Sequence, residues 1–272
     1  MKERPYIGIT GATEKSDVVQ VAESFRRHLD AERNHFGMVG FLVTDRTAAN
    51  QSAGRSSKHP QFVDMVQLLE ASQPGPKNAI HYSTRDRSTL AAQIDSIFGK
   101  TGIYGAELAR TLQLNLRWPD PDEIKRIIDR FPDMNIILQL GSKILEHDSR
   151  GEIVDRLASY EGINYVLIDP SGGKGVPFNE KRVAPLFRAI NYELPDLGIA
   201  VAGGFSDKNA LSALSNLTRA IATDEFSIDA EGGLRVPVQG KKSGGFSPTK
   251  ADLFIQRASS FFAPALPTLT PR

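Results

Sequence analysis

An aspartate followed by clustered glycines is the feature of this sequence most suited to chemistry. In LIDPSGGKG (residues 167–175), Asp169 ends an apolar run, and Gly172, Gly173 and Gly175 come soon after it. Glycine lets backbone N–H groups approach a ligand without interference from a Cβ atom, and successive N–H groups form a concavity that binds anions. The stretch therefore predicts an acidic side chain beside an anion site, for which phosphate is the usual occupant.

Two later loops have the same character. In AVAGGFSDKN, Gly203 and Gly204 end a predicted strand, and a helix capped near Ser206 would turn its positive N-terminus toward an anion. In FSIDAEGG, Ser227 lies in a strand that leads into two more glycines. These glycines could instead serve only to make tight turns. Three such loops together favour a binding role.

Other polar residues leave several alternatives open. His81, near the end of a predicted strand, could be a general base, a metal ligand or a buried hydrogen-bonded histidine. A metal site needs more converging oxygen and nitrogen ligands than this pattern offers, so we expect none. Lys143 could form a Schiff base or remain solvated, and Trp118 could stack on a planar ligand or close the rim of the fold.

Composition excludes several classes of function. The 272 residues include 33 Lys and Arg against 32 Asp and Glu, a net charge of +1, so no global field favours nucleic acid or an anionic membrane. Without cysteine the chain has no disulfide and no thiol nucleophile. The N-terminal residues lack an apolar signal region, and no apolar run reaches the ~18 residues of a membrane span. We expect a cytoplasmic protein.

Short β-branched runs alternate with segments of helical period, a pattern typical of βαβ units on a parallel sheet. Eight such pairs predict a (β/α)8 TIM barrel, an α/β fold, as a single domain over residues 1–272 with an irregular tail at 264–272. The predicted strands are Tyr6–Thr10, Met38–Thr44, Asn78–Ser83, Thr111–Leu116, Asn135–Leu140, Tyr165–Asp169, Gly198–Ala202 and Ala220–Ile228. The predicted helices are Asp17–Arg33, Pro60–Ala71, Ser88–Phe98, Pro121–Arg130, Arg150–Tyr160, Glu180–Ile190, Asp207–Asn216 and Pro248–Phe262.

The element ends support this division of the chain. Asp120 followed by Pro121, and Ser206 followed by Asp207, have the residue types of helix N-caps. The long Gly-, Ser- and Pro-rich loops all follow strands, and in a (β/α)8 barrel those loops form the face that carries function. Residues 99–110 are not assigned to a helix or a strand.

Six motifs resemble those of phosphoribosylanthranilate isomerase, a ribulose-phosphate-binding barrel of tryptophan biosynthesis. They are IGIT (7–10), MVGFLV (38–43), LQLN (112–115), LID with GGKG (167–175), AVAGGFSDKN (200–209) and SIDAEGG (227–233). The resemblance implies an Amadori rearrangement, in which one general acid and one general base convert an aminoaldose phosphate into an aminoketose. Asp169 matches the general acid of the family.

The chain departs from the family at several functional positions. The family's general base is a cysteine immediately before Gly-Ile-Thr, and Ile7 stands there instead. Asn115 replaces a histidine, and Ile228 and Asp229 replace small residues of the phosphate motif. Repulsion between Asp229 and a phosphate about 4 Å away would be about 4 kcal/mol at an effective dielectric near 20, unless that carboxylate points away. A non-phosphate ligand is expected if it points inward.

Further family positions have counterparts here. Glu225, Ser227 and Glu231 match the acidic, serine and glutamate positions of the eighth-strand motif, and Arg55, or less well Arg46, matches a substrate-positioning arginine.

Two functions therefore remain open. The first is a divergent isomerase-like or lyase-like barrel that binds a small phosphorylated sugar-type ligand at its C-terminal face, using Asp169 with His81, Asp45 or Glu225 as its acid–base partner. The alternative is a catalytically inactive barrel that binds a small ligand. In either case we expect no cofactor, and a homodimer is left open.

Overall fold

The computed structural model describes residues 2–29, 34–49, 58–171, 178–236 and 244–263. Arg55, the glycines at 172, 173 and 175, and the predicted tail at 264–272 lie outside the described residues.

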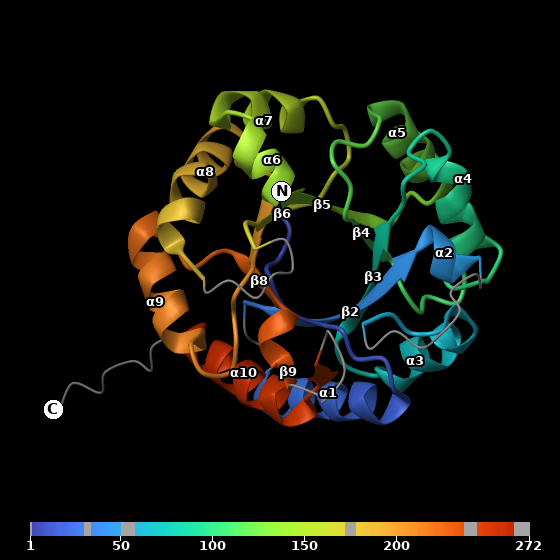
Figure 1. The fold of residues 1–272 in the computed structure, drawn as a ribbon, viewed down its shortest axis with the longest axis horizontal. Helices are drawn as coiled ribbons and strands as arrows, with labels where there is room; N and C mark the ends of the chain where they lie inside the picture. The colour runs from blue at the N-terminus through green and yellow to red at the C-terminus, as the bar shows by residue number, and fades with distance from the viewer. Residues whose placement is uncertain (1, 30–33, 50–57, 172–177, 237–243, 264–272) are drawn as a thin grey trace, which may run out of the picture.

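Eight parallel strands form a closed barrel in which β1 pairs with β8. Helices surround it in a ring (Figure 1). The predicted (β/α)8 fold is therefore confirmed. The strands are β1 (Tyr6–Thr10), β2 (Phe36–Thr44), β3 (Lys77–Ser83), β4 (Thr111–Leu114), β5 (Asn135–Gly141), β6 (Tyr165–Asp169), β7 (Gly198–Ala202) and β8 (Ser227–Ala230).

The helices that cover the barrel agree with the predicted segments to within a few residues at most ends. The α-helices are α1 (Lys15–His28), α2 (Asp45–Ala48), α3 (Met65–Ala71), α4 (Leu90–Ile94), α5 (Pro121–Arg130), α6 (Ser142–His147), α7 (Arg150–Ala158), α8 (Glu180–Glu193), α9 (Ala210–Ile221) and α10 (Pro248–Phe261). Shorter elements are η1 (Phe62–Asp64), the π-helical η2 (Asp95–Gly99), η3 (Gly232–Leu234) and the antiparallel pair β9 (Arg235–Val236) and β10 (Gly245–Phe246).

The start of the eighth strand was predicted wrongly. Ala220 and Ile221 form the last turn of α9, and Ala222 ends that helix in the left-handed conformation, with φ of 59°. The first residues of the predicted strand belong to the helix, because Ile221 continues the buried stripe of Leu214 and Leu217 at helical spacing.

One of the two predicted helix caps is confirmed. Asp120 accepts a hydrogen bond from the backbone N–H of Asp122, with Pro121 in the first turn of α5. The cap predicted at Ser206 and Asp207 is wrong, since α9 begins after Asn209. The Asn209 side chain instead closes the preceding turn, accepting a hydrogen bond from the Ser206 backbone N–H at 2.7 Å.

Period-two alternation divides the strand residues into two buried layers. One layer packs between the barrel and its helices and includes Ile7, Ile9 and Ile228. The other fills the barrel interior and includes Tyr6 and Tyr165, whose rings meet edge to face with centroids 5.5 Å apart. Toward the carboxyl ends of the strands the inward positions become polar, so the interior is apolar at one end and hydrophilic at the other.

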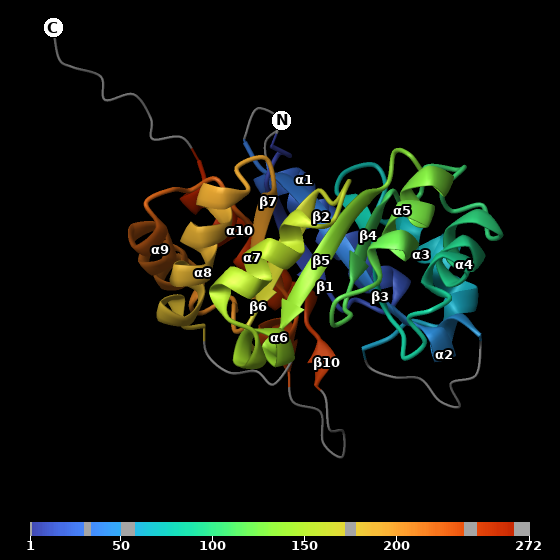
Figure 2. The same cartoon turned by 90° about the horizontal axis from the view of Figure 1, so that it is seen from above.

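The polar end of the barrel is the end toward which the strands run. Figure 2 shows α2, α6 and β10 on that side, while the N-terminus lies on the opposite side. The C-terminal face of a (β/α)8 barrel is the face that carries function, so this is where a site is expected.

Replacing Tyr165 with alanine should destabilise the fold strongly. Tyr165 is 3% exposed and its hydroxyl donates a hydrogen bond to the Arg4 carbonyl at 2.6 Å, so truncation leaves a cavity in the barrel interior. We expect a loss of about 3–5 kcal/mol in the free energy of unfolding, measured in urea. Tyr192→Ala is the matched control: that residue is 82% exposed, and we expect a change below about 0.5 kcal/mol. Equal losses in both variants would contradict the assignment of Tyr165 to the interior.

Candidate active site

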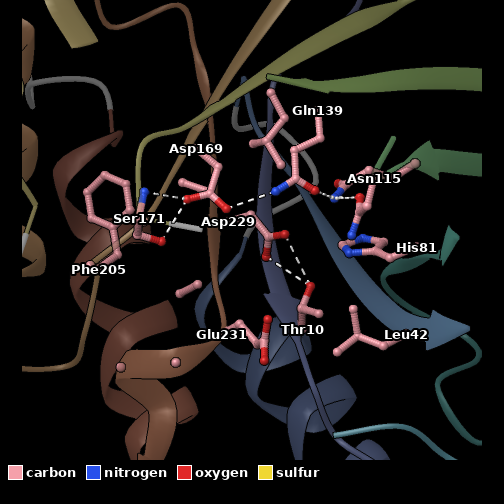
Figure 3. A pocket seen from close by; sticks show the side chains of 18 of the residues that line it. Thr10, Leu42, His81, Asn115, Gln139, Asp169, Ser171, Phe205, Asp229 and Glu231 are labelled. Carbon is pink, nitrogen blue, oxygen red and sulfur yellow. Dashed lines mark hydrogen bonds between the residues drawn. The ribbon is translucent and has the colours of Figure 1, made fainter. Parts of the chain in front are cut away.

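A cavity of about 70 Å³ opens at the carboxyl ends of the strands. Each of the eight strands contributes at least one lining residue, which for β7 is Ala202 (Figure 3). A wider cavity of about 380 Å³ adjoins it and shares four lining residues, Asn115, Gln139, Asp169 and Glu231. The inner cavity lies among all eight strand ends, and the wider one extends from it over the ends of β4, β5 and β6.

Asp169 lies at one wall of this cavity, at the end of β6, as the sequence predicts. Its carboxylate accepts hydrogen bonds from the Ser171 backbone N–H (3.0 Å) and hydroxyl (2.7 Å), and from Gln139 Nε2 (2.8 Å). Gly203, with φ of 93°, lets the loop after β7 pass close by, because a Cβ atom there would lie 2.8 Å from Asp169 Oδ1. The carboxylate is therefore fixed in one orientation.

Asp229 points into the cavity from β8 (Figure 3). It is 6% exposed, and the Thr10 hydroxyl lies 3.0 and 3.1 Å from its two oxygens. Gly8 makes room for it, since a Cβ atom there would lie 3.0 Å from Asp229 Oδ1. Burial raises the pKa of Asp229 to about 7, against the lowering effect of the Thr10 hydrogen bond and with further raising by Glu231 and Asp169.

The two aspartates thus stand in unlike environments around one cavity. Asp169 accepts three hydrogen bonds, whereas Asp229 is bound by the Thr10 hydroxyl and the Ala230 backbone N–H and has a pKa of about 7. A third carboxylate, that of Glu231, carries ion pairs to Lys58 (3.3 Å) and Arg235 (3.7 Å). Two carboxyl groups with different surroundings are the usual equipment of an acid–base pair.

A row of amides connects Asp169 to the far wall. Gln139 Nε2 binds Asp169, while Gln113 Nε2 lies 3.5 Å from Gln139 Oε1 and donates to Asn115 Oδ1 at 2.9 Å. His81 lies next to this row, 2% exposed, and burial lowers its pKa to about 3. Among the described residues no partner is present for His81 Nε2 or Gln113 Oε1.

Ile7 does not face this cavity. It is fully buried in the layer between the barrel and the helices, and the inward positions of β1 are Gly8 and Thr10. By the family motif, Ile7 stands in the place of the catalytic base and should face the cavity. The alternation along β1 turns it toward the helices instead. At this part of the wall the groups able to carry a proton are Thr10 and Asp229.

The predicted glycine loops after β7 and β8 do come together at the cavity. Gly203, Gly204, Gly232 and Gly233 all line it. Of these, Gly203 and Gly204 have a positive φ. The two loops are in contact, since a Cβ atom on Gly233 would lie 2.0 Å from the Phe205 carbonyl oxygen.

Lys250 of α10 holds the backbone of the loop after β8 and lies beside the side chain of Asp207, which follows β7. Its ammonium donates to the carbonyls of Gly233 (2.8 Å) and Arg235 (3.1 Å) and lies 3.6 Å from Asp207 Oδ1. A lysine on an outer helix therefore sets the shape of the cavity rim without lining it.

Two predicted site residues lie at the other end of the barrel. Glu225 is exposed and precedes β8, and Ser227 begins that strand, where its hydroxyl oxygen accepts a hydrogen bond from the Tyr6 backbone N–H at 3.0 Å. Neither reaches the cavity, because the carboxyl end of β8 is formed by later residues. From this motif it is Asp229 and Glu231 that line the cavity.

The remaining candidates are distributed more widely. Trp118 donates to Asp148 Oδ2 at 2.6 Å and stacks on Tyr160, which matches closure of the rim. Lys143 lines the wider cavity, and Asp45 begins α2 outside both cavities. In the described parts of the chain no three His, Asp or Glu side chains are grouped closely enough to hold a metal ion.

Sequence reasoning missed much of the polar lining. Thr10, Gln113, Gln139 and Ser171 all bind one another or the aspartates; three of them lie within the family motifs without having been assigned a role, and Gln139 lies outside every motif. A usable signal exists: Gln113 and Gln139 are polar residues inside apolar strands, at alternate positions from Asn115 and Gly141.

Solved structures with the same fold include several phosphoribosylanthranilate isomerases. The enzyme of Thermus thermophilus superposes with a TM-score of 0.59 at 16% identity, over 96% of this chain and 99% of the enzyme. Another, in complex with reduced 1-(o-carboxyphenylamino)-1-deoxyribulose 5-phosphate, gives 0.57 at 15% identity, over 94% and 99%. This chain has the fold of phosphoribosylanthranilate isomerase.

The isomerase fold is shared with enzymes of other activity. A chitinase active domain from Pyrococcus furiosus, in complex with chito-oligosaccharides, superposes with a TM-score of 0.59 at 10% identity, over 98% of both chains. No protein-family profile and no curated protein sequence matches the chain. None of the helices among the described residues has the length and apolar character needed to cross a bilayer. Function must therefore be argued from the site.

Replacing Asp229 with asparagine should change how stability depends on pH. The pKa of Asp229 is about 7 in the folded state and about 4 in an unfolded chain, so between these values the folded state holds a proton that unfolding releases. Raising the pH through this window therefore destabilises the wild type relative to Asp229→Asn. We expect the advantage of the variant to grow to a few kcal/mol by pH 8, measured by urea unfolding at pH 5, 6, 7 and 8.

Asp129→Asn provides the control for this titration, since Asp129 is an exposed carboxylate paired with Lys125. Its effect should stay below about 0.5 kcal/mol and show no trend across the same pH values. Parallel curves for the two variants would contradict the assigned environment of Asp229.

Proposed function

We propose that this protein is an acid–base isomerase of a small sugar-type ligand bound at the C-terminal face of the barrel. The observation that carries the proposal is the pair formed by Asp169 and Asp229, two carboxyl groups that line one cavity in different environments. Amide and hydroxyl groups make up much of the remaining wall, which suits a polyhydroxylated ligand.

The environments assign the two roles. Asp229, whose pKa burial raises to about 7, can hold a proton near neutral pH and donate it to a carbonyl or ring oxygen. Asp169 is a carboxylate that accepts hydrogen bonds from Gln139 and Ser171, and it can take a proton from the carbon beside that carbonyl. As Asp169 takes the proton from carbon and Asp229 protonates the carbonyl oxygen, an enediol forms. Asp169 then returns its proton to the former carbonyl carbon while Asp229 takes the proton of the hydroxyl on the neighbouring carbon, so both groups are restored and the isomerisation needs no cofactor. These roles differ from the family pattern, in which the counterpart of Asp169 is the acid.

A phosphate group on the ligand would bind to the paired glycine loops, not beside Asp229. Gly204 and Gly232 lie at the rim, whereas Asp229 lies deeper, level with Gly8 of β1. The isomerase of the same fold that binds a deoxyribulose 5-phosphate is the reason for considering a phosphorylated ligand. In this arrangement the carboxylates contact the uncharged, reacting end of the ligand.

A second candidate is a barrel that binds a small ligand without converting it. The three carboxylates of Asp169, Asp229 and Glu231 favour this reading, because they oppose an anionic ligand. The inner cavity of about 70 Å³ is also small for a whole pentose phosphate, which would need the adjoining cavity as well.

Ligand binding can be tested by a thermal-shift titration with inorganic phosphate, ribulose 5-phosphate and the reduced isomerase product analogue. A ligand at one hundred times its Kd should raise the free energy of unfolding by about 2.7 kcal/mol. We expect a saturable rise with the phosphosugars that is lost in Gly204→Asp. Gly102→Asp is the matched control, because Gly102 also has a positive φ, 77°, and does not line the cavity. No response to any phosphorylated compound would refute a phosphorylated ligand.

Catalysis can be tested by deuterium exchange at the carbons beside the carbonyl of ribulose 5-phosphate, followed by NMR in D2O. An acid–base isomerase exchanges these protons, and Asp169→Asn and Asp229→Asn should each reduce the rate by about 100-fold or more. Ribulose 5-phosphate that binds in the thermal-shift titration without exchange would instead support the non-catalytic candidate.

A further inference from the structure

Two polar atoms inside the barrel have no part in the acid–base pair. His81 of β3 and Gln113 of β4 are partners in the strand register, so their side chains lie next to each other in the barrel interior. Among the described residues, His81 Nε2 and Gln113 Oε1 both lack a hydrogen-bond partner, although each side chain is 2% exposed. Burying such atoms unpaired costs free energy, which a ligand that satisfies both would recover.

The strand next to β3 makes room for the His81 side chain. A Cβ atom on Gly40 of β2 would lie 2.4 Å from Thr10 Oγ1 and 2.5 Å from His81 Nε2, so glycine allows both side chains to extend over β2. Thr10 in turn binds Asp229, and all these side chains border the cavity. His81 Nε2 therefore lies near Thr10, the residue that binds Asp229, and is not itself part of the acid–base pair.

We propose that His81 Nε2 and Gln113 Oε1 form a buried subsite for one uncharged hydroxyl group of a sugar-type ligand. The proposal rests on the function proposed above and adds to it the residues that select the end of the ligand remote from the phosphate. A ligand bound in this way presents its hydroxyl end to β3 and β4 and its reacting carbons to the two aspartates.

The chemistry of the two atoms selects a hydroxyl. A carbonyl oxygen such as Gln113 Oε1 only accepts, and His81 Nε2 donates when the imidazole proton is on that nitrogen. A hydroxyl accepts from the imidazole and donates to the amide, which satisfies both atoms. A phosphate or carboxylate oxygen would leave Gln113 unpaired, and an ammonium group would require the opposite histidine tautomer. The subsite thus also fixes His81 as the Nε2-protonated form.

The subsite can be observed directly through the 15N and 1H NMR signals of the imidazole nitrogens. The chain has five histidines, and the His81 signals are those lost in His81→Gln. The probes are ribitol, an unreactive polyol without phosphate, and ribulose 5-phosphate. We expect an Nε2-protonated His81 whose Nε2 signals shift saturably with both compounds, and about a tenfold weaker binding in His81→Gln and Gln113→Leu. The thermal-shift response to inorganic phosphate should not change in these variants.

His35→Gln is the control variant. His35 is equally buried and has a pKa lowered by burial to about 4, but its Nε2 pairs with the Phe226 carbonyl, next to the amino end of β8. It tests whether loss of a buried histidine alone weakens binding, and we expect no change in the affinity for either probe.

The outcomes separate this inference from the function on which it rests. If ribulose 5-phosphate raises the melting temperature while the His81 signals stay unchanged, the subsite is refuted and the proposed function stands. An Nε2-unprotonated His81, or a water molecule between the two atoms in a crystal saturated with ribitol, also refutes the subsite. If ribitol shifts His81 but no phosphosugar binds, the subsite stands and the phosphorylated ligand is refuted. If neither probe binds, both are refuted.

Discussion

The pairing of β1 with β8 closes the barrel and also creates the space in which a carboxyl group can be buried. Gly8 is the register partner of Asp229, and this missing side chain is what allows a charged residue to point inward from the last strand. Thr10, two positions further along β1, then provides the hydrogen bond. Burial of Asp229 and closure of the sheet are therefore coupled, and the raised pKa of the carboxyl group is a consequence of the strand register.

The same period-two constraint explains what the sequence could and could not predict. Strand positions and the ring of helices follow from local apolar patterns, and β1, β6 and β7 are predicted to the residue. The direction in which a side chain points depends on register, which a family motif does not reveal. In β1, Ile7 points toward the helices and Thr10 points into the cavity. A shift of the register by one residue would exchange these two faces.

Asp169 was identified because its type and its place at a strand end are both local features. The row formed by Gln113, Gln139 and Asn115 was not, because it joins residues of neighbouring strands that are far apart in sequence. Glu225 was assigned to the site through the family motif, and the true boundary of β8 removes it. Pairing between strands is thus the information that was missing.

The likeness to both phosphoribosylanthranilate isomerase and a chitinase shows how little the barrel restricts its chemistry. In this chain the polar residues that could give it a particular activity lie at the inward positions near the carboxyl ends of the strands. An apolar floor that includes Tyr6 and Tyr165 supports them from below, so polar substitutions above it can vary while the fold persists.

The position of Lys250 has a consequence for the biogenesis of the protein. This lysine belongs to α10, which packs against α1, and its ammonium binds two carbonyls of the loop after β8 and lies near the carboxylate of Asp207, which follows β7. During synthesis the first seven strands leave the ribosome long before residues 248–261 do. The cavity rim therefore cannot reach its final shape until the helix after β8 has emerged, and a nascent chain that has folded most of its barrel still lacks a completed site.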